Sequence, residues 1–159
     1  MTRIDFYTNV DSRERTACTI AAKALERGVR LFVLTSDKAH SESVDRLMWT
    51  FAQLSFLPHV RAAHPLAAQT PVIVDHVFDP LPHDQVLLNL TDTTPSVFSR
   101  FERLVEIVSL DPDDRQRART RWRFYSERGY ALASHDLAGQ GKGTATAAAG
   151  ASGRSAAGG

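Results

Sequence analysis

Six arginines gather between residues 115 and 128 of this 159-residue chain, and three aromatic residues stand among them: Trp122, Phe124 and Tyr125. Guanidinium groups form charge-assisted hydrogen bonds with carboxylates or phosphates, and a flat aromatic ring can bury the apolar part of the same ligand. Six arginines against three carboxylates give residues 113–128 a net charge of +3, whereas the whole chain carries +1. The sequence therefore predicts a local docking surface for an acidic ligand.

The arginine-rich segment has the start signals of a helix. Asp111 suits the N-cap, Pro112 suits the first helical position, and the two aspartates that follow complement the positive end of the helix dipole. Because successive helical residues turn by about 100°, the arginines fall into two stripes. The predicted binding surface is one stripe with the indole beside it: Arg115, Arg119, Arg123 and Trp122. The second stripe holds Arg117, Arg121 and Arg128 on a different side.

An apolar strip on this helix predicts which side faces the core. Ala118, Trp122 and Tyr125 share that strip, which puts Trp122 at its edge, against the first arginine row. A solvated helix face is the alternative interpretation of so many charges.

The composition predicts one folded domain followed by a tail. Hydrophobic residues make up 43% of the chain, enough for a core. We expect a folded unit at residues 1–136 and a disordered tail at residues 137–159, because Gly, Ala and Ser dominate that end and bury too little to offset the entropy of ordering. Cys18 is the single cysteine and is expected in the core. With no long apolar run and a strand-like N-terminus, the protein is expected to be soluble and cytoplasmic.

Strand and helix patterns alternate along the chain. They predict a single Rossmann-like, three-layer α/β domain with a mostly parallel sheet of about five strands and helices on both faces. The expected strands are residues 3–8, 29–34, 71–76, 85–90 and 105–110. Four helices are expected. The first begins at Asp11, with Glu14 in a capping box, and ends at Gly28. The second follows residues 35–37 and buries Val44, Leu47, Met48 and Phe51, the third spans residues 97–104, and the fourth begins at Asp111.

Catalytic and cofactor motifs are missing from the sequence. The turn after the first strand, residues 8–12, has no glycine to let backbone amides approach a pyrophosphate. Residues 139–144 are glycine-rich but lack both the ending of a phosphate loop and its flanking strand and helix. The six histidines show no tight metal-ligand spacing, although Asp75 and His76 lie at a strand end near Asp79 and His83. We expect a noncatalytic protein without a metal or cofactor.

A second surface is predicted around residues 47–59, which hold more large apolar residues than one helix face can bury. Trp49, Phe56 and Leu57 are the surplus. Exposed aromatic residues near a loop are typical of a protein interface. The alternative is that they cover the sheet edge.

The ordered set of these segments resembles the chi-subunit family of bacterial DNA polymerase III, an accessory protein of the clamp loader. The residues that carry the resemblance are Ile4–Tyr7, Leu47–Trp49, Phe56–His59, Thr70–Val72, Ala118–Tyr125 and Gly129–Tyr130. The resemblance covers residues 1–136, and no single motif is diagnostic. Arg and Trp stand where relatives often use Lys and Tyr, and the C-terminal tail extends past the usual family end.

The resemblance implies a noncatalytic adaptor of the polymerase III holoenzyme. It would pair with the psi subunit through Trp49 and Phe56, and it would grip the acidic C-terminal tail of single-stranded DNA-binding protein through Arg115, Arg119, Trp122 and Arg123. Two other functions stay open at this stage. One is a module that binds single-stranded nucleic acid directly, through arginines interleaved with aromatic residues. The other is a small nucleotide-dependent enzyme.

Overall fold

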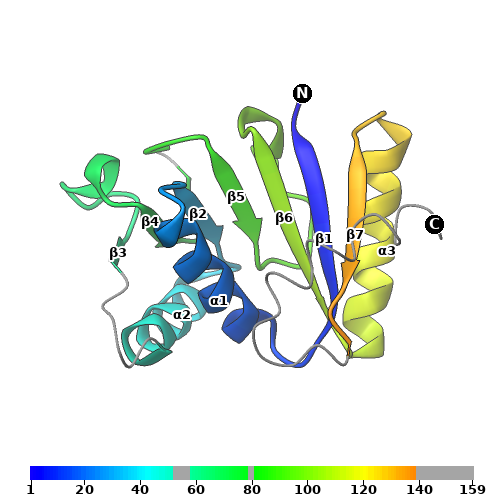
Figure 1. Cartoon of the computed structure of the whole chain (residues 1–159), viewed down its shortest axis with the longest axis horizontal. Helices are drawn as coiled ribbons and strands as arrows, with labels where there is room; N and C mark the ends of the chain where they lie inside the picture. The colour runs from blue at the N-terminus through cyan, green and yellow to red at the C-terminus, as the bar shows by residue number, and fades with distance from the viewer. Residues whose placement is uncertain (52–57, 79–80, 139–159) are drawn as a thin grey trace.

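A computed structural model describes residues 1–51, 58–78 and 81–138. In this part of the chain, seven parallel strands form one sheet in the order β3-β4-β2-β5-β6-β1-β7 (Figure 1). The strands are β1 (Arg3–Val10), β2 (Leu31–Leu34), β3 (His59–Val60), β4 (Val72–Asp75), β5 (Val86–Asn89), β6 (Arg103–Ser109) and β7 (Leu132–Asp136). The helices are α1 (Arg13–Glu26), α2 (Lys38–Phe51) and α3 (Pro112–Glu127), with short 3₁₀ turns η1 (Ala67–Gln69) and η2 (Phe98–Arg100).

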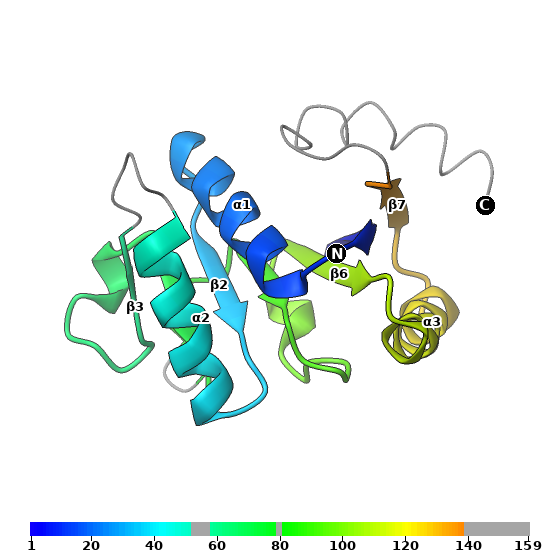
Figure 2. The same ribbon diagram turned by 90° about the horizontal axis from the view of Figure 1, so that it is seen from below.

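Helices cover both faces of the sheet, as predicted. Buried residues of α1 and α2 pack with one set of strand side chains, and those of α3 and the 3₁₀ turns pack with the other. Figure 2 shows α1 and α2 side by side and α3 well apart from them. Because side chains alternate along a strand, Ile4 and Phe6 of β1 belong to the α3 side and Tyr7 to the α1 side. An irregularity between Tyr7 and Val10 places Val10 on the α1 side as well. The predicted α/β class and three-layer arrangement are confirmed.

The sheet has seven strands rather than about five, because sequence reasoning missed β3 and β7. The β7 sequence, LASHD, is poor in strong β-formers, and the strand pairs with β1 alone at the end of the sheet. The prediction of a helix over residues 97–104 is wrong, because this segment forms only the turn η2 and then the start of β6. Tertiary pairing with β1 and β5 decides the conformation there.

The helix ends agree with the sequence signals at three of four places, one of which is Asp37, whose carboxylate accepts from the His40 amide at the start of α2. Asp111 caps α3 by accepting from the Asp113 amide, and Gly28 follows α1 with a φ of +69°. The N-cap of α1 is Ser12, which accepts from the Arg15 amide, so the predicted capping box at Asp11 is wrong. Glu14 bonds to the ring of His40 instead.

Three other expectations concern the core, the tail and the membrane. Cys18 is buried as predicted, and burial raises the pKa of its thiol to about 12. Described structure continues to Ala138, with Leu137 packed in the core, and residues 139–159 lie outside the described part, so the tail stays a prediction. Among the described residues, none of the helices is long and apolar enough to cross a membrane.

His83 should make the protein less stable as the pH falls. Burial, helped by the charge of Arg30, lowers the His83 pKa from 6.5 to about 4. Between these values the unfolded chain binds a proton that the folded protein does not, so stability is lost as the pH falls from 6.5 toward 4. In urea titrations, we expect His83→Gln to reduce the difference in unfolding free energy between neutral and mildly acidic pH by about 1–2 kcal/mol. His64→Gln, at an exposed histidine, is the control; an unaltered pH dependence in His83→Gln would contradict the assignment.

Candidate docking surface on helix α3

The inner face of α3 is fixed to the sheet by a buried polar cluster. Glu106 of β6 accepts hydrogen bonds from Arg121 Nε at 3.0 Å, from the Tyr125 hydroxyl at 2.6 Å and from the Asn89 amide at 3.1 and 3.2 Å. Burial raises the Glu106 pKa, and the charge of Arg121 opposes that rise. This cluster sets the rotation of α3 about its axis, and thereby decides which arginines reach solvent.

The second arginine stripe has structural partners. Arg121 is 1% exposed and paired with Glu106, so within this stripe it faces the core, whereas Arg117 and Arg128 are exposed. The Arg117 Nε lies 3.5 Å from a carboxylate oxygen of Asp92, and the Arg128 guanidinium lies 3.5 Å from the centre of the Phe124 ring. The positions 118, 121 and 125 share one helix face, a spacing that could have indicated a buried Arg121.

The first stripe borders a groove between α3 and the edge of the sheet. Arg115, Arg119 and Trp122 line a hollow of about 240 Å³. The other lining residues are Phe6, Thr8, Asn9, Val108, Ala118 and Ser134. The Trp122 ring meets the Phe6 ring edge to face at 5.0 Å, and the residue remains 36% exposed. The indole is therefore anchored on one side and available on the other, as its predicted place at the edge of the apolar strip requires.

The arginines of this groove are available for a ligand. Arg115, Arg119 and Arg123 are exposed, and they form no ion pair with any residue that the structure describes. Arg119 makes one weak hydrogen bond, to the Gln116 side chain at 3.3 Å. Arg123 does not line the hollow. The structure thus brings three of the four predicted residues together, with Arg123 one turn further along the same row.

Sequence reasoning missed the residues that the sheet contributes to the groove. Phe6 and Asn9 come from β1, and Ser134 comes from β7, near opposite ends of the chain. Asn9 has a φ of +63° and donates to Asp136 at 2.8 Å, which fixes the rim of the groove. The alternation of β1 could have marked Phe6, but Ser134 could not be found without β7.

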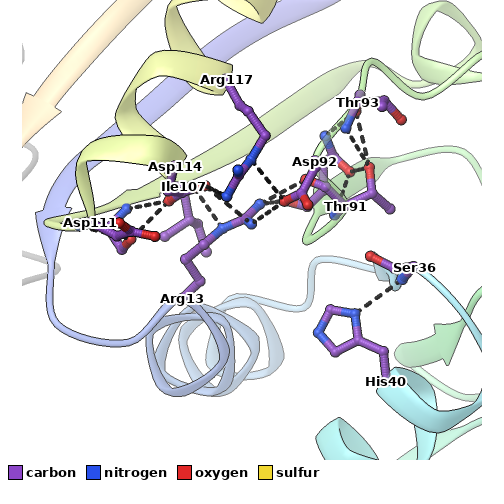
Figure 3. A network of polar contacts seen from close by, with 12 residues as sticks. Arg13, Ser36, His40, Thr91, Asp92, Thr93, Ile107, Asp111, Asp114 and Arg117 are labelled. Atoms are coloured by element: carbon purple, nitrogen blue, oxygen red, sulfur yellow. Dashed lines mark hydrogen bonds and ion pairs between the residues drawn. The ribbon is translucent and has the colours of Figure 1, made fainter.

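The carboxyl edge of the sheet, where parallel α/β folds commonly bind nucleotides, holds a network of charged side chains (Figure 3). Arg13 at the start of α1 donates to the Thr91 carbonyl at 2.9 Å, and its Nη1 lies 3.3 Å from Asp92 and 3.4 Å from Asp114. Asp114 in turn accepts from the Ser109 amide at 2.8 Å. The network joins α1, the loop after β5 and α3. In the described ranges, no group of three His, Cys, Asp or Glu side chains could hold a metal ion.

The predicted second surface is only partly within the described residues. Trp49 on α2 is 56% exposed, and its ring lies 5.0 Å from that of His59 on the edge strand β3. His59 is buried and lies 2.8 Å from Asp45. Phe56 and Leu57 lie outside the described residues. On this surface the structure therefore places one large exposed aromatic side chain, Trp49, which packs against the ring of His59.

Fold and groove together define a parallel α/β domain whose accessible basic and aromatic side chains line the outer face of its last helix. Comparison with known proteins identifies its family. The model of the family described as "DNA polymerase III chi subunit, HolC" matches residues 1–133. The chain therefore belongs to the chi-subunit family of DNA polymerase III and is a replication accessory subunit that associates with the holoenzyme.

Two curated relatives carry the same description. The DNA polymerase III subunit chi of Pseudomonas aeruginosa is 36% identical over 141 residues, which are 86% of this chain and 98% of the relative. The DNA polymerase III subunit chi of Haemophilus influenzae is 22% identical over 125 residues, which are 78% of this chain and 87% of the relative. Both matches extend over most of the chain.

Proposed function

We propose that this subunit is a noncatalytic bridge. Through Arg115, Arg119, Trp122 and Arg123 it grips the acidic C-terminal tail of single-stranded DNA-binding protein, and through Trp49 and Phe56 it binds the psi subunit of the clamp loader. In this role the protein makes and breaks no covalent bond, needs no cofactor, and works in the bacterial cytoplasm at replication forks. One observation supports the proposed binding of the acidic tail: exposed arginines that form no ion pair with a described residue stand beside an anchored indole at the mouth of a hollow.

The shape of the groove suits a peptide end that is both acidic and apolar. Carboxylates of the tail would receive charge-assisted hydrogen bonds from Arg115 and Arg119. An apolar terminal side chain would fill the hollow against Trp122, Phe6 and Ala118. Since the arginines are exposed, salt screens this attraction, and the affinity should fall as the salt concentration rises.

Direct binding of single-stranded DNA, the alternative interpretation, has less support. Stacking of several bases needs several exposed aromatic faces. Tyr125 is fully buried, and the Arg128 guanidinium covers a face of Phe124. Of the three aromatic residues in the arginine-rich segment, only Trp122 is therefore well placed to stack.

A competition titration tests the proposal. We expect the full chain to bind a fluorescently labelled peptide that carries the C-terminal tail sequence of the same bacterium's single-stranded DNA-binding protein. An unlabelled peptide should displace it, whereas oligothymidylate at equal concentration should not. A chain that binds the oligonucleotide tightly and ignores the peptide would overturn the proposal in favour of direct DNA binding.

The psi surface gives a separate prediction. Because more than half of Trp49 is exposed, its removal costs little folding energy but removes a large anchor from an interface. We expect Trp49→Ala to weaken binding of the psi subunit by about 2 kcal/mol or more, roughly thirtyfold, as measured by calorimetry. Leu110→Ala, at another exposed apolar residue, is the matched control. Equal affinities for Trp49→Ala and wild type would place the psi interface elsewhere.

A further inference from the structure

A second hollow lies on the opposite face of β1 from the α3 groove. It has a volume of about 480 Å³, twice that of the groove. Asp5 and Tyr7 of β1 line it, whereas Phe6 between them lines the α3 groove. Residues 16–24 of α1 and its C-cap Arg27 form one wall, and Ala133 and His135 of β7 belong to the other side. The two hollows are therefore separate, and a ligand in one leaves the other accessible.

Four cationic side chains line this second hollow, at the amino edge of the sheet. Arg3 and Arg103 are Cα partners at the first residues of β1 and β6. Lys23 and Arg27 come from the last turn and the C-cap of α1, whose carboxyl end leads back to the start of β2. Figure 1 shows these ends of α1, β1 and β6 on the same side of the molecule. The cations thus gather at one end of the hollow.

Among the described residues that line the hollow, Asp5 is the one carboxylate, and it is already well paired. Arg103 Nε lies 2.6 Å from one of its oxygens, and the His135 ring lies 3.0 Å from the other. Burial opposes ionisation of Asp5, but the His135 hydrogen bond and the Arg103 charge hold its pKa below the usual value. Arg3 is 3.7 Å from the same carboxylate. The positive charges of Arg3 and Arg103 therefore exceed the single negative charge of the buried Asp5 carboxylate.

The remaining cations, Lys23 and Arg27, are stabilised by the negative end of the α1 dipole but have little compensation from acidic side chains. The Lys23 ammonium lies 4.0 Å from Glu26, and in the described part of the chain the Arg27 side chain has no hydrogen bond or ion pair. Like charges around one hollow repel each other, and a compact polyanion bound between them would relieve that repulsion. The chain's own C-terminal stretch does not supply one, because residues 139–159 contain Lys142 and Arg154 but no acidic side chain.

We propose that this hollow binds a diphosphate group, free or as part of a nucleoside diphosphate, between Arg3, Lys23, Arg27 and Arg103. Away from the cations, the hollow offers apolar contacts from Ile20, Val105 and Leu137 and hydroxyls from Thr16 and Thr19, which suit the nucleoside part. Its volume is in the range of small-molecule sites. Single-stranded DNA fits less well, because it needs cations along a track rather than at one end.

Calorimetric titration of the full chain with ADP and with inorganic pyrophosphate tests the site. We expect saturable binding at physiological salt, and we expect Arg27→Gln to weaken it about tenfold, the effect of one lost charge-assisted contact. Arg15→Gln is the matched control, because it removes the same charge from an exposed position on α1 outside the hollow. It should change the affinity less than about twofold. Trp122→Ala should bind as wild type does, since it alters only the α3 groove.

The two ligands separate the possible sources of the phosphates. Equal affinity for pyrophosphate and ADP would assign the site to the diphosphate alone, and tighter binding of ADP would assign it to a nucleoside diphosphate. Absence of heat with both ligands would overturn the proposal. Equal losses of affinity for these ligands in Arg27→Gln and Arg15→Gln would also overturn it. So would a protein that binds oligothymidylate but neither ligand, if Arg27→Gln weakens the binding of oligothymidylate.

Discussion

Replacing Arg121 by alanine is expected to lower the free energy of unfolding by about 3–5 kcal/mol, the cost of breaking a buried ion pair from one side. Glu106 would keep its hydrogen bonds from Tyr125 and Asn89 but lose the guanidinium that compensates its charge. The Arg121 Nη1 bond to the Asp92 carbonyl, at 2.9 Å, would be lost as well. Urea denaturation followed by far-ultraviolet circular dichroism measures the change.

Arg117→Ala is the control for this measurement. It removes the same charge from the same helix, but its side chain is 43% exposed, its partner Asp92 is exposed as well, and its contact with the buried Asp114 is long, at 4.0 Å. We therefore expect a change below about 1 kcal/mol. A loss in Arg121→Ala no larger than in the control would show that the buried cluster does not hold α3 in place. The double replacement Arg121→Met with Glu106→Leu should recover part of the stability, since it leaves no unpaired buried charge. The recovery is incomplete because the buried Tyr125 hydroxyl and Asn89 amide lose Glu106 as an acceptor.

The second large effect concerns the tail peptide of single-stranded DNA-binding protein. We expect the double variant Arg115→Ala/Arg119→Ala to lose about 2–5 kcal/mol of binding free energy, because each arginine contributes about 1–3 kcal/mol through its charge-assisted contacts. Fluorescence anisotropy with the labelled peptide measures the loss. Both side chains are exposed and form no ion pair within the part of the chain that the structure describes, so the unfolding free energy should stay close to that of wild type.

Arg117→Ala also serves here, because its guanidinium faces Asp92 rather than the groove. It should bind the peptide within about twofold of wild type, as expected for a charge outside the contact. Arg123→Ala should have a smaller effect than Arg119→Ala, because Arg123 does not line the hollow. Wild-type affinity in the double variant would show that the tail binds elsewhere on the protein.

The groove was predictable where it depends on one helix, and unpredictable where it depends on the sheet. Asp111 and Pro112 predict the start of α3, and the helical period puts Arg115, Arg119 and Trp122 on one side of it. These are local signals, and they survive folding because α3 is a regular helix. The resemblance to chi subunits added the expected partners, which helical geometry alone could not name.

Errors arose where tertiary contacts override local patterns. Arg121 reads as one more surface arginine until Glu106 of β6 is known to lie beneath it. The strand β7 has weak propensity and exists because β1 offers it a hydrogen-bonding edge. Ser12 rather than Asp11 caps α1, a choice between adjacent polar residues that the spacing of Glu14 pointed to wrongly. The errors at Arg121 and β7 concern residues whose partners are distant in sequence, whereas the error at Ser12 is local.

The position of β1 between β6 and β7 has a consequence for synthesis of the protein. The first strand to leave the ribosome must wait for neighbours that begin 100 and 129 residues after it, at Arg103 and Leu132. Such long-range pairing forms late and slowly. Until then Phe6 has neither Trp122 nor Ser134 beside it. A nascent or truncated chain would lack the assembled groove, so recruitment to the replication machinery would be confined to chains whose translation has run past β7.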